Sequence, residues 1–361
     1  MLFDPKPKER RQELFDRDEE LRTLEKLTRT GSPIILLLGI RRIGKTSVLK
    51  TFLNESSKPH VFIDARKLSE LGYSKAGLYT ILSEEFTKLK NKLSTVTQYL
   101  KLRGVKISGF GVEFDWRSKE LSISSILERM NEFAERNDTV FLLAIDEAQL
   151  LRFMRGGGRI DFRQIIAYSY DNLENVKFLL SGSEVGLLHE FLGLEDPESP
   201  LYGRLHDTLT LERFSTKDSL KFLELGFNEI GVNVPDTVLE RAVEALDGIP
   251  GWLAYFGYEY AKTKNPEVVD QILDSAINLA LNEIKKLGNY SALYVHVLRA
   301  VAMGFKRWSR IKKTVEAWLG RPISNQTLTR ILKNLEKMSI LKSNKEYEFL
   351  DPVVREASKR L

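Results

Sequence analysis

A stretch near the start of the chain, LLLGIRRIGKTSVLK over residues 36–50, places two glycines around a basic loop that ends in Lys-Thr. Its spacing fits the pattern G-x-x-x-x-G-K-[ST] without a mismatch. Glycines let successive backbone N–H groups turn inward around an anion, and the helix that follows adds its own free N–H groups. Lys45 can reach the terminal phosphates, Thr46 offers a hydroxyl to Mg²⁺, and Ser47 can contact the α-phosphate. The residues predicted to bind a nucleotide's phosphates are Gly39, Arg42, Ile43, Gly44, Lys45, Thr46 and Ser47.

Within this set Arg42 is open to two interpretations. The guanidinium groups of Arg41 and Arg42 could contact phosphate or a neighbouring subunit. A solvated basic loop is an equal alternative.

A second motif, TVFLLAIDEAQLL over residues 139–151, ends an apolar run in two adjacent carboxylates. At the end of a buried strand, Asp146 would hold Mg²⁺ through water, and Glu147 would polarise the attacking water. Such a run is common by itself, but it becomes specific when it follows a phosphate loop. Glu147 and Lys45 are therefore the predicted catalytic residues, and the reaction they indicate is hydrolysis rather than nucleotide binding alone.

A third apolar run, NVKFLLSGSEVGLL over residues 175–188, ends in Ser181-Gly-Ser183. In a parallel doubly wound sheet the carboxyl ends of the strands line the ligand crevice. The hydroxyls of Ser181 and Ser183 are therefore candidates to sense the γ-phosphate or to orient water. A turn of small residues after a buried strand is the equal alternative.

These runs, with PHVFIDARKL over residues 59–68, are typical of buried strands in a parallel sheet with helices on both faces. We expect a P-loop α/β domain over residues 1–214 and an all-α lid over 215–287. The alternating segment 105–116 predicts a hairpin, either a partner contact or a structural insertion. The glycine-rich segment 154–162 predicts a mobile loop.

The composition limits the classes of function. The chain of 361 residues has no cysteine and only four histidines without ligand spacing, which excludes disulfides and thiol chemistry and makes a zinc site improbable. No signal core opens the sequence, and its apolar runs are too short to span a bilayer. We therefore expect a soluble, cytoplasmic protein without a membrane partner.

The last part of the chain, residues 288–361, is strongly basic. Residues 290–361 hold 15 Lys and Arg against 6 Asp and Glu, so their net charge is +9, whereas the whole chain carries +5 and the remainder −4. This asymmetry points to a polyanionic partner, although a lysine-rich surface is the simpler alternative. Three predicted helices and two short strands around Ser343-Asn344 resemble a winged-helix domain. On the outer face of its third helix, 324–338, the candidates for contact with duplex DNA are Gln326, Thr327, Arg330, Lys333 and Lys337.

The order of these motifs resembles the AAA+/STAND group of P-loop ATPases, and most closely its predominantly archaeal ATPase family. The segments LFDRDEELRTLEKL, GIRRIGKTSVL and LLAIDEAQ carry the resemblance, with SPLYGRLHDTLTLERFS over 199–215 and DGIPGWLAYFG over 247–257. It implies ATP or ADP as ligand and Mg²⁺ as cofactor. It also implies that Phe15 and Arg17 border adenine, that Pro250 packs near adenine or ribose, and that Arg204 is an arginine finger or γ-phosphate sensor. Some relatives have an arginine after the sensor strand, where this chain has Ser181-Gly-Ser183.

The resemblance implies an ATP-hydrolysing molecular switch whose nucleotide state controls the winged helix and assembly. In such relatives the winged helix often packs on the nucleotide domain as an autoinhibitory clamp, so DNA contact and clamping both remain open. Whether Arg204 acts in cis or in trans is equally open, and a role in trans would require self-association. The alternatives are a DNA-binding replication initiator or helicase loader, a signalling scaffold that holds ADP and assembles with itself or a protein partner, and a small-molecule phosphotransferase.

Overall fold

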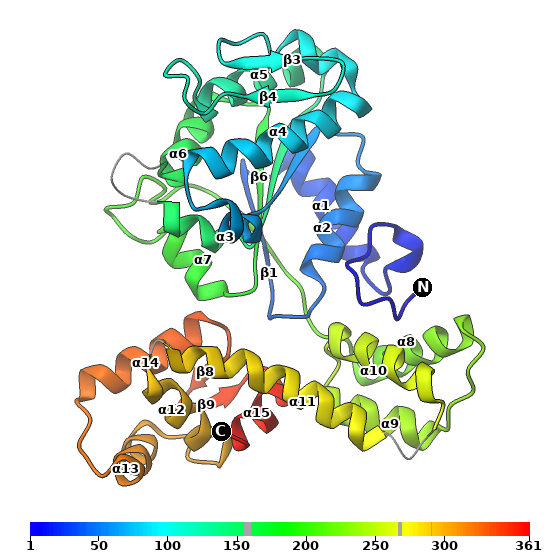
Figure 1. Ribbon diagram of the computed structural model, residues 1–361, viewed down its shortest axis with the longest axis vertical. Helices are drawn as coiled ribbons and strands as arrows, with labels where there is room; N and C mark the ends of the chain where they lie inside the picture. The colour runs from blue at the N-terminus through cyan, green and yellow to red at the C-terminus, as the bar shows by residue number, and fades with distance from the viewer. Residues whose placement is uncertain (155–159, 266–268, 290) are drawn as a thin grey trace.

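The computed structural model describes residues 1–154, 160–265, 269–289 and 291–361. Most of the glycine-rich segment 154–162, for which we predicted a mobile loop, lies outside these ranges. Figure 1 shows an α/β body at the top, with a layer of helices and a small hairpin beneath the carboxyl edge of its sheet.

The predicted parallel sheet is confirmed. Among the described residues its five strands have the order β2-β5-β6-β1-β7, and all neighbouring pairs are parallel. The strands β1, β5 and β6 are buried along their whole length, which explains their continuous apolar sequences. The sequence did not indicate β7, a short edge strand in which half-buried residues alternate with exposed ones. The bounds are β1 Ile34–Leu38, β2 His60–Asp64, β5 Phe141–Asp146, β6 Val176–Gly182 and β7 Asp207–Thr210.

Helices cover both faces of this sheet, as expected. Alternate residues of β1 face opposite sides: Ile35 and Leu37 pack with α1 and α2, whereas Ile34 and Leu36 pack with the helices of the other face. The helices of this body are α1 Asp18–Thr30, α2 Lys45–Glu55, α3 Leu68–Leu71, α4 Lys75–Lys92, α5 Ile123–Arg136, α6 Phe162–Asn172 and α7 Val185–Leu192.

The predicted hairpin over 105–116 is present. Its strands β3 Val105–Ile107 and β4 Val112–Phe114 are antiparallel, and Val112 and Phe114 are buried against α4. Phe110, at the turn, is fully exposed.

Four helices follow the sheet and form the layer that we name the lid: α8 Thr216–Glu229, α9 Asp236–Leu246, α10 Pro250–Thr263 and α11 Val269–Lys285. Ser215 caps α8 by accepting a hydrogen bond from the backbone N–H of Asp218. No helix in the described ranges combines the length and the apolar character that a membrane span requires.

The C-terminal region has the predicted three helices and hairpin, followed by one more helix. The prediction placed the turn of the hairpin at Ser343-Asn344, and this was wrong. Both residues lie in the first strand, and Lys345 makes the turn with a φ of 73°. The elements are α12 Ala292–Ala302, α13 Trp308–Leu319, α14 Asn325–Lys337, β8 Leu341–Asn344, β9 Glu346–Phe349 and α15 Pro352–Lys359.

One apolar core runs through the lid and the C-terminal region. It contains Phe256 of α10, Ile284 of α11 and Ala357 of α15, and α11 packs along α15. The lid and the C-terminal region therefore share one apolar core, and the boundary near residue 287 between them stays a prediction.

Candidate nucleotide-binding site

The phosphate loop connects β1 to α2 and takes its shape from residues with positive φ. Gly39 has a φ of 147°, Arg42 of 67° and Gly44 of 100°, and Gly44 lies directly before the first turn of α2. A Cβ atom on Gly39 would lie 2.9 Å from the side chain of Ile43. Ile43 is itself buried in the core beneath α2. The loop is thus fixed by its own buried isoleucine while its backbone remains at the surface of a cavity.

Lys45 is folded back onto this loop. Its Nζ donates hydrogen bonds to the carbonyl oxygens of Gly39 and Ile40, both at 2.8 Å. Burial lowers the pKa of Lys45 to about 8. An ammonium group held in this way by two neutral acceptors is poised to bind an anion that enters the loop.

Two oxygen ligands suited to Mg²⁺ meet beside the loop. The carboxyl group of Asp146, at the end of β5, accepts a hydrogen bond of 2.7 Å from the hydroxyl of Thr46 and another from Ser181. Burial raises the pKa of Asp146. A hydroxyl and a carboxylate in contact are a hard oxygen pair of the kind that Mg²⁺ prefers, so these residues fit the predicted metal.

Glu147 is turned away from Asp146 and has a φ of 53°. Its Oε2 accepts hydrogen bonds from Gln149 Nε2 at 2.7 Å, from the Ser183 hydroxyl at 2.9 Å and from the Ser183 backbone N–H at 3.2 Å. Ser181, near the end of β6, and Ser183, directly after it, therefore each contact one of the two carboxylates. We did not predict a role for Gln149, although it stands in the motif that predicted Asp146 and Glu147.

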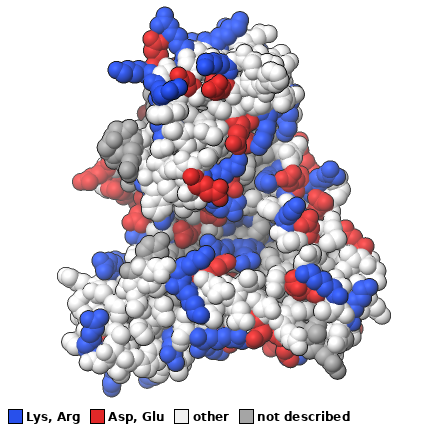
Figure 2. Space-filling model, viewed as in Figure 1, with Lys and Arg blue, Asp and Glu red and all other residues white. Residues whose placement is uncertain are grey.

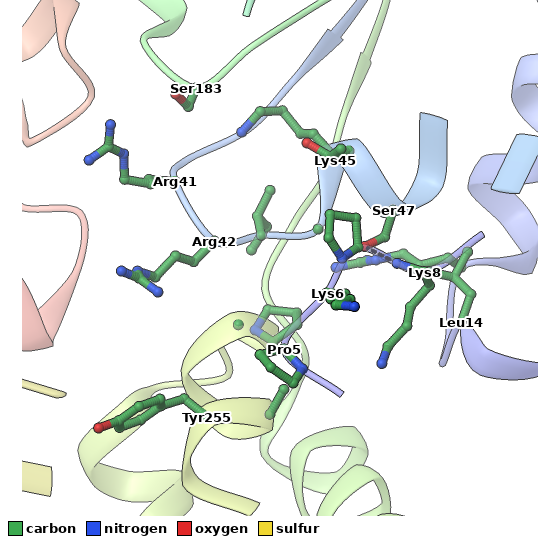
Figure 3. A pocket seen from close by; sticks show the side chains of 18 of the residues that line it. Pro5, Lys6, Lys8, Leu14, Arg41, Arg42, Lys45, Ser47, Ser183 and Tyr255 are labelled. Atoms are coloured by element: carbon green, nitrogen blue, oxygen red, sulfur yellow. Dashed lines mark hydrogen bonds between the residues drawn. The ribbon is translucent and has the colours of Figure 1, made fainter. Parts of the chain in front are cut away.

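A cavity of about 630 Å³ lies between the phosphate loop and the lid. Figure 3 shows Lys45 and Ser47 on its α2 side, Arg41 and Arg42 on the loop, and Tyr255 on the lid. Of the predicted site residues, Gly39, Asp146 and Ser181 are buried behind this surface. Those that line the cavity are Phe15, Arg17, Arg42, Ile43, Gly44, Lys45, Thr46, Ser47, Glu147, Ser183 and Pro250.

The end of the cavity away from the phosphate loop is apolar. Phe15 packs edge-on against Phe214 and Phe222, with ring centroids 5.3 Å and 5.5 Å apart, and Pro250 lies beside them at the start of α10. The guanidinium of Arg17 is occupied by Glu20 and by the carbonyl of Glu212. An apolar end joined to a phosphate loop matches the two halves of a nucleotide.

The lid holds the loop through Arg42. The backbone carbonyl of Arg42 accepts a hydrogen bond of 2.9 Å from the N–H of Gly251, and its guanidinium lies 4.0 Å from the ring centroid of Trp252. Glu283 of α11 binds both loop arginines, at 2.7 Å to Arg41 and 2.9 Å to Arg42. Although burial favours its neutral form, these two cations lower the pKa of Glu283.

The structure does not bring Arg204 to the cavity. Its guanidinium pairs with Asp171 and lies 5.0 Å from the ring centroid of Tyr170. Arg204 is not among the residues that line the cavity. A role in cis would require Arg204 to leave these partners. A role in trans remains a prediction.

The candidates for contact with DNA lie on α14, in two different environments. Gln326, Arg330 and Lys333 are exposed, and they line a shallow groove of about 460 Å³. Lys337 lines the same groove, but it is half-buried and forms an ion pair of 3.1 Å with Glu190 of α7. Thr327 donates its backbone N–H to Ser324 at the start of the helix.

Comparison with known proteins agrees with this geometry. Residues 14–256 match the model of an ATPase domain predominantly from Archaea. The chain belongs to this family. The family is one of ATPases, and a cavity that joins a phosphate loop to an apolar end agrees with that activity. Residues 291–350 match the C-terminal winged helix-turn-helix domain of MCM proteins.

Solved structures extend the likeness to nearly the whole chain. A Walker-type ATPase of Pyrococcus abyssi is 38% identical, with a TM-score of 0.88 over 99% of this chain and 100% of the other. The ORC2 protein of Aeropyrum pernix, in a structure titled as ADPNP–ADP complexes, shares the fold at 14% identity, with a TM-score of 0.64 over 99% and 95%. Among curated proteins none matches the sequence.

Proposed function

We propose that this ATPase is a STAND-type molecular switch, in which Mg-ATP binding and hydrolysis control the position of the winged-helix region. The proposal divides the chain at residues 214 and 287 into a P-loop domain, a lid and a winged-helix domain. It places the protein in the cytoplasm, with ATP, ADP and Mg²⁺ as its ligands.

The chemistry needs four side chains of the cavity. Lys45 would exchange its two carbonyl partners for phosphate oxygens, and Thr46 and Asp146 would hold Mg²⁺, which neutralises charge on the phosphates. Glu147 would accept the proton of the attacking water. In this structure Glu147 is held by Gln149 and Ser183, so Ser183 competes with water for the same carboxylate.

The proposed switch is supported by a chain of contacts that begins at Arg42 and ends in the C-terminal region. Arg42 lies against the indole ring of Trp252, and the indole N–H donates to Asp351 Oδ2 at 2.9 Å. Asp351 also caps α15 by accepting from the backbone N–H of Val353. A γ-phosphate that attracts Arg42 would weaken its hold on Trp252 and Glu283, and thereby loosen the lid and the helix next to it.

A second contact explains why this motion would matter. The end of α14 packs on α7 of the nucleotide-binding body, where a Cβ atom on Gly186 would lie only 2.5 Å from the Cα atom of Lys337. The backbone N–H of Val185 donates to the Ser339 hydroxyl at 3.1 Å. When the C-terminal region is docked in this way, α7 covers one end of α14. Release of the C-terminal region would expose that end.

The test uses the absence of cysteine from the chain. Dyes attached at Lys101→Cys on the α/β body and Lys313→Cys on α13 report their separation by energy transfer, with ADP and with a slowly hydrolysed ATP analogue. We expect two different efficiencies, and the same difference during turnover of ATP. Equal efficiencies in both nucleotides, with ATP still hydrolysed, would contradict the switch and leave the ATPase intact.

Binding of duplex DNA is a second candidate function, and the groove on α14 favours it. Gln326, Arg330 and Lys333 lie on its exposed face, and these side-chain types read base edges and contact phosphates. The fold shared with ORC2 and the match to the MCM winged helix are consistent with this role. A replication initiator or helicase loader would use the helix in this way.

Two lysines of α14, Lys333 and Lys337, provide a matched test of DNA binding. Lys333→Ala should weaken binding of duplex DNA and reduce the slope of log affinity against log salt by about one. Lys337→Ala should leave binding unchanged in nucleotide-free protein, because Glu190 already occupies that lysine. Anisotropy of labelled DNA measures both. Binding that is absent, or equally weakened by the two changes, would argue against readout by α14.

Assembly is the third part of the proposal. Because Arg204 lies outside its own cavity, an arginine finger would have to act on a neighbouring copy. Turnover per molecule that rises with protein concentration, and loses this rise in Arg204→Ala, would support self-association. Turnover independent of concentration would favour a monomer that signals to another protein.

A further inference from the structure

The first nine residues of the chain cross the mouth of the cavity, and none of the motifs predicted this. Leu2, Asp4, Pro5, Lys6, Pro7 and Lys8 all line the cavity. In Figure 3 the segment that carries Pro5, Lys6 and Lys8 lies between α2 and the lid helix α10. Figure 2 shows the hollow between the two bodies, with Lys and Arg side chains along it. We name residues 1–9 the strap.

One end of the strap is anchored in the lid by Phe3. This side chain is completely buried, and its ring packs edge-on against Phe222 and Phe227 at centroid distances of 5.7 Å and 4.8 Å. The space for the ring is made by glycines on two helices. A Cβ atom would lie 2.3 Å from the ring on Gly226 of α8 and 2.5 Å from it on Gly257 of α10. Glycine within a helix lowers the stability of that helix. At these two positions the glycines make room for the Phe3 ring, which accounts for their presence.

The other end is anchored on α2, the helix that begins at Lys45. The backbone N–H of Lys8 donates to the Ser47 hydroxyl at 3.1 Å, and Asn54 donates to the carbonyl of Glu9 at 3.2 Å. Lys50 pairs with the Glu9 carboxylate at 2.8 Å. Within six residues the chain therefore connects the core of the lid to the phosphate-binding helix.

The strap is stiff between its anchors. Pro5 and Pro7 fix their own φ angles and disfavour helix in the residues before them. The Lys8 ammonium donates to the carbonyls of Met1 and Asp4 at 2.7 Å and 2.9 Å, which folds the segment on itself. A stiff connector transmits a change at one anchor to the other, whereas a flexible one would absorb it.

We propose that the strap is a wall of the ATP site that travels with the lid, and that Phe3 is a positioning residue for nucleotide binding. This inference rests on the proposed binding of ATP between the phosphate loop and the lid. Phe3 touches no nucleotide itself. It holds Lys6 and the prolines across the cavity, where they close the site over the bound ligand and slow its release. The Ser47 hydroxyl, which binds the strap, is also a predicted phosphate contact, so an incoming nucleotide meets the strap directly.

Three variants separate this role from simple stability. Phe3→Ala leaves a cavity in the lid, and Gly226→Ala drives its new methyl group into the ring. In the double variant the methyl group enters the vacated space, so the melting temperature should recover above that of Phe3→Ala. The strap lacks its anchor in the lid both in Phe3→Ala and in the double variant. ATP affinity should therefore fall about tenfold in Phe3→Ala and stay low in the double variant, while kcat at saturating ATP stays within about twofold. Phe3→Leu should recover part of the affinity.

The outcomes are distinct. A double variant that is as stable as the parent and binds ATP as tightly would overturn the proposal. A parent protein that binds no ATP, or binds it equally with Lys45→Ala, would instead overturn the proposed function.

Thiol labelling provides a measurement that does not depend on the anchor variants. In an otherwise cysteine-free chain, Lys6→Cys should react with a maleimide more slowly when ATP is bound, by about tenfold, and Phe3→Ala should abolish this protection. Lys101→Cys, exposed on the far part of the α/β body, serves as the control and should react at the same rate throughout. Equal labelling of Lys6→Cys with and without ATP would exclude a strap that closes over the ligand.

Discussion

The two ends of the proposed ATP site are built in different ways. The phosphate end is made by one uninterrupted stretch, residues 39–47, with two carboxylates at the end of β5, which is separated from β1 by β6. The apolar end is assembled from segments far apart in the chain: the strap, Phe15, Phe214 and the first turns of α10. A backbone cradle needs special φ angles and therefore leaves a local sequence pattern, whereas a wall of packed side chains needs only shape. We therefore expect single substitutions at the phosphate end to cause large losses of ATP binding or turnover. Substitutions at the apolar end should cause smaller, graded losses of ATP affinity.

The largest effect is expected at the phosphate end, from Lys45→Ala. The ammonium group can donate two charge-assisted hydrogen bonds to phosphate, each contributing about 2 kcal/mol, so ATP affinity should fall by about a thousandfold. Calorimetric titration measures the loss. Lys26→Ala, an exposed lysine on α1, is the control and should bind ATP as the parent does. Binding that survives in Lys45→Ala would mean that the loop is not the main anchor of the nucleotide.

The next effect separates binding from chemistry at the same end. Glu147→Gln keeps the size of the side chain and its acceptor oxygen, so the contacts with Ser183 can persist and ATP affinity should change by less than about threefold. Turnover should fall by about a hundredfold, because an amide cannot take a proton from water. Phosphate release measured at saturating ATP tests this. Equal turnover in Glu147→Gln and the parent would assign the proton transfer to another group.

The two ends of the site also differ in how much of them the sequence predicts. The loop, the strand carboxylates and the parallel sheet were predictable because each depends on neighbours in sequence. Phe3 could not be found, since the glycines that reveal its socket lie more than 200 residues away and glycine within a helix has several explanations. Arg204 shows a different limit of the sequence. A family motif carries a role but not a position, and in this chain the residue pairs with Asp171.

A third prediction concerns the connection between the site and the C-terminal region. Trp252→Phe keeps an aromatic ring beneath Arg42 and removes the N–H that binds Asp351. Burial raises the pKa of Asp351, so the carboxyl group is costly to leave without this donor. ATP affinity should change by less than about twofold, while hydrogen exchange in α15 should become about tenfold faster, as expected for the loss of one hydrogen bond to a charged group.

Asp351→Asn is the matched control for that prediction, because it changes the same contact from its other side. Its single amide oxygen can still accept from the cap of α15, but the indole N–H then faces an amide NH2 that cannot accept, so exchange should increase about as much as in Trp252→Phe. If exchange in α15 is the same in the parent and in Trp252→Phe, the indole N–H does not transmit the state of the loop.

The smallest effect is expected where α14 rests on α7. The ion pair between Lys337 and Glu190 is partly exposed on both sides, and pairs of this kind contribute about 0.5 kcal/mol. Glu190→Gln should therefore shift the docking equilibrium by only about twofold in the energy-transfer assay, and added salt should erase the difference. Gly186→Ala adds one methyl group at the same contact, 2.5 Å from the backbone of Lys337, and should undock α14 far more strongly. If Glu190→Gln has the larger effect, charge rather than close backbone packing holds the winged helix against the ATPase body.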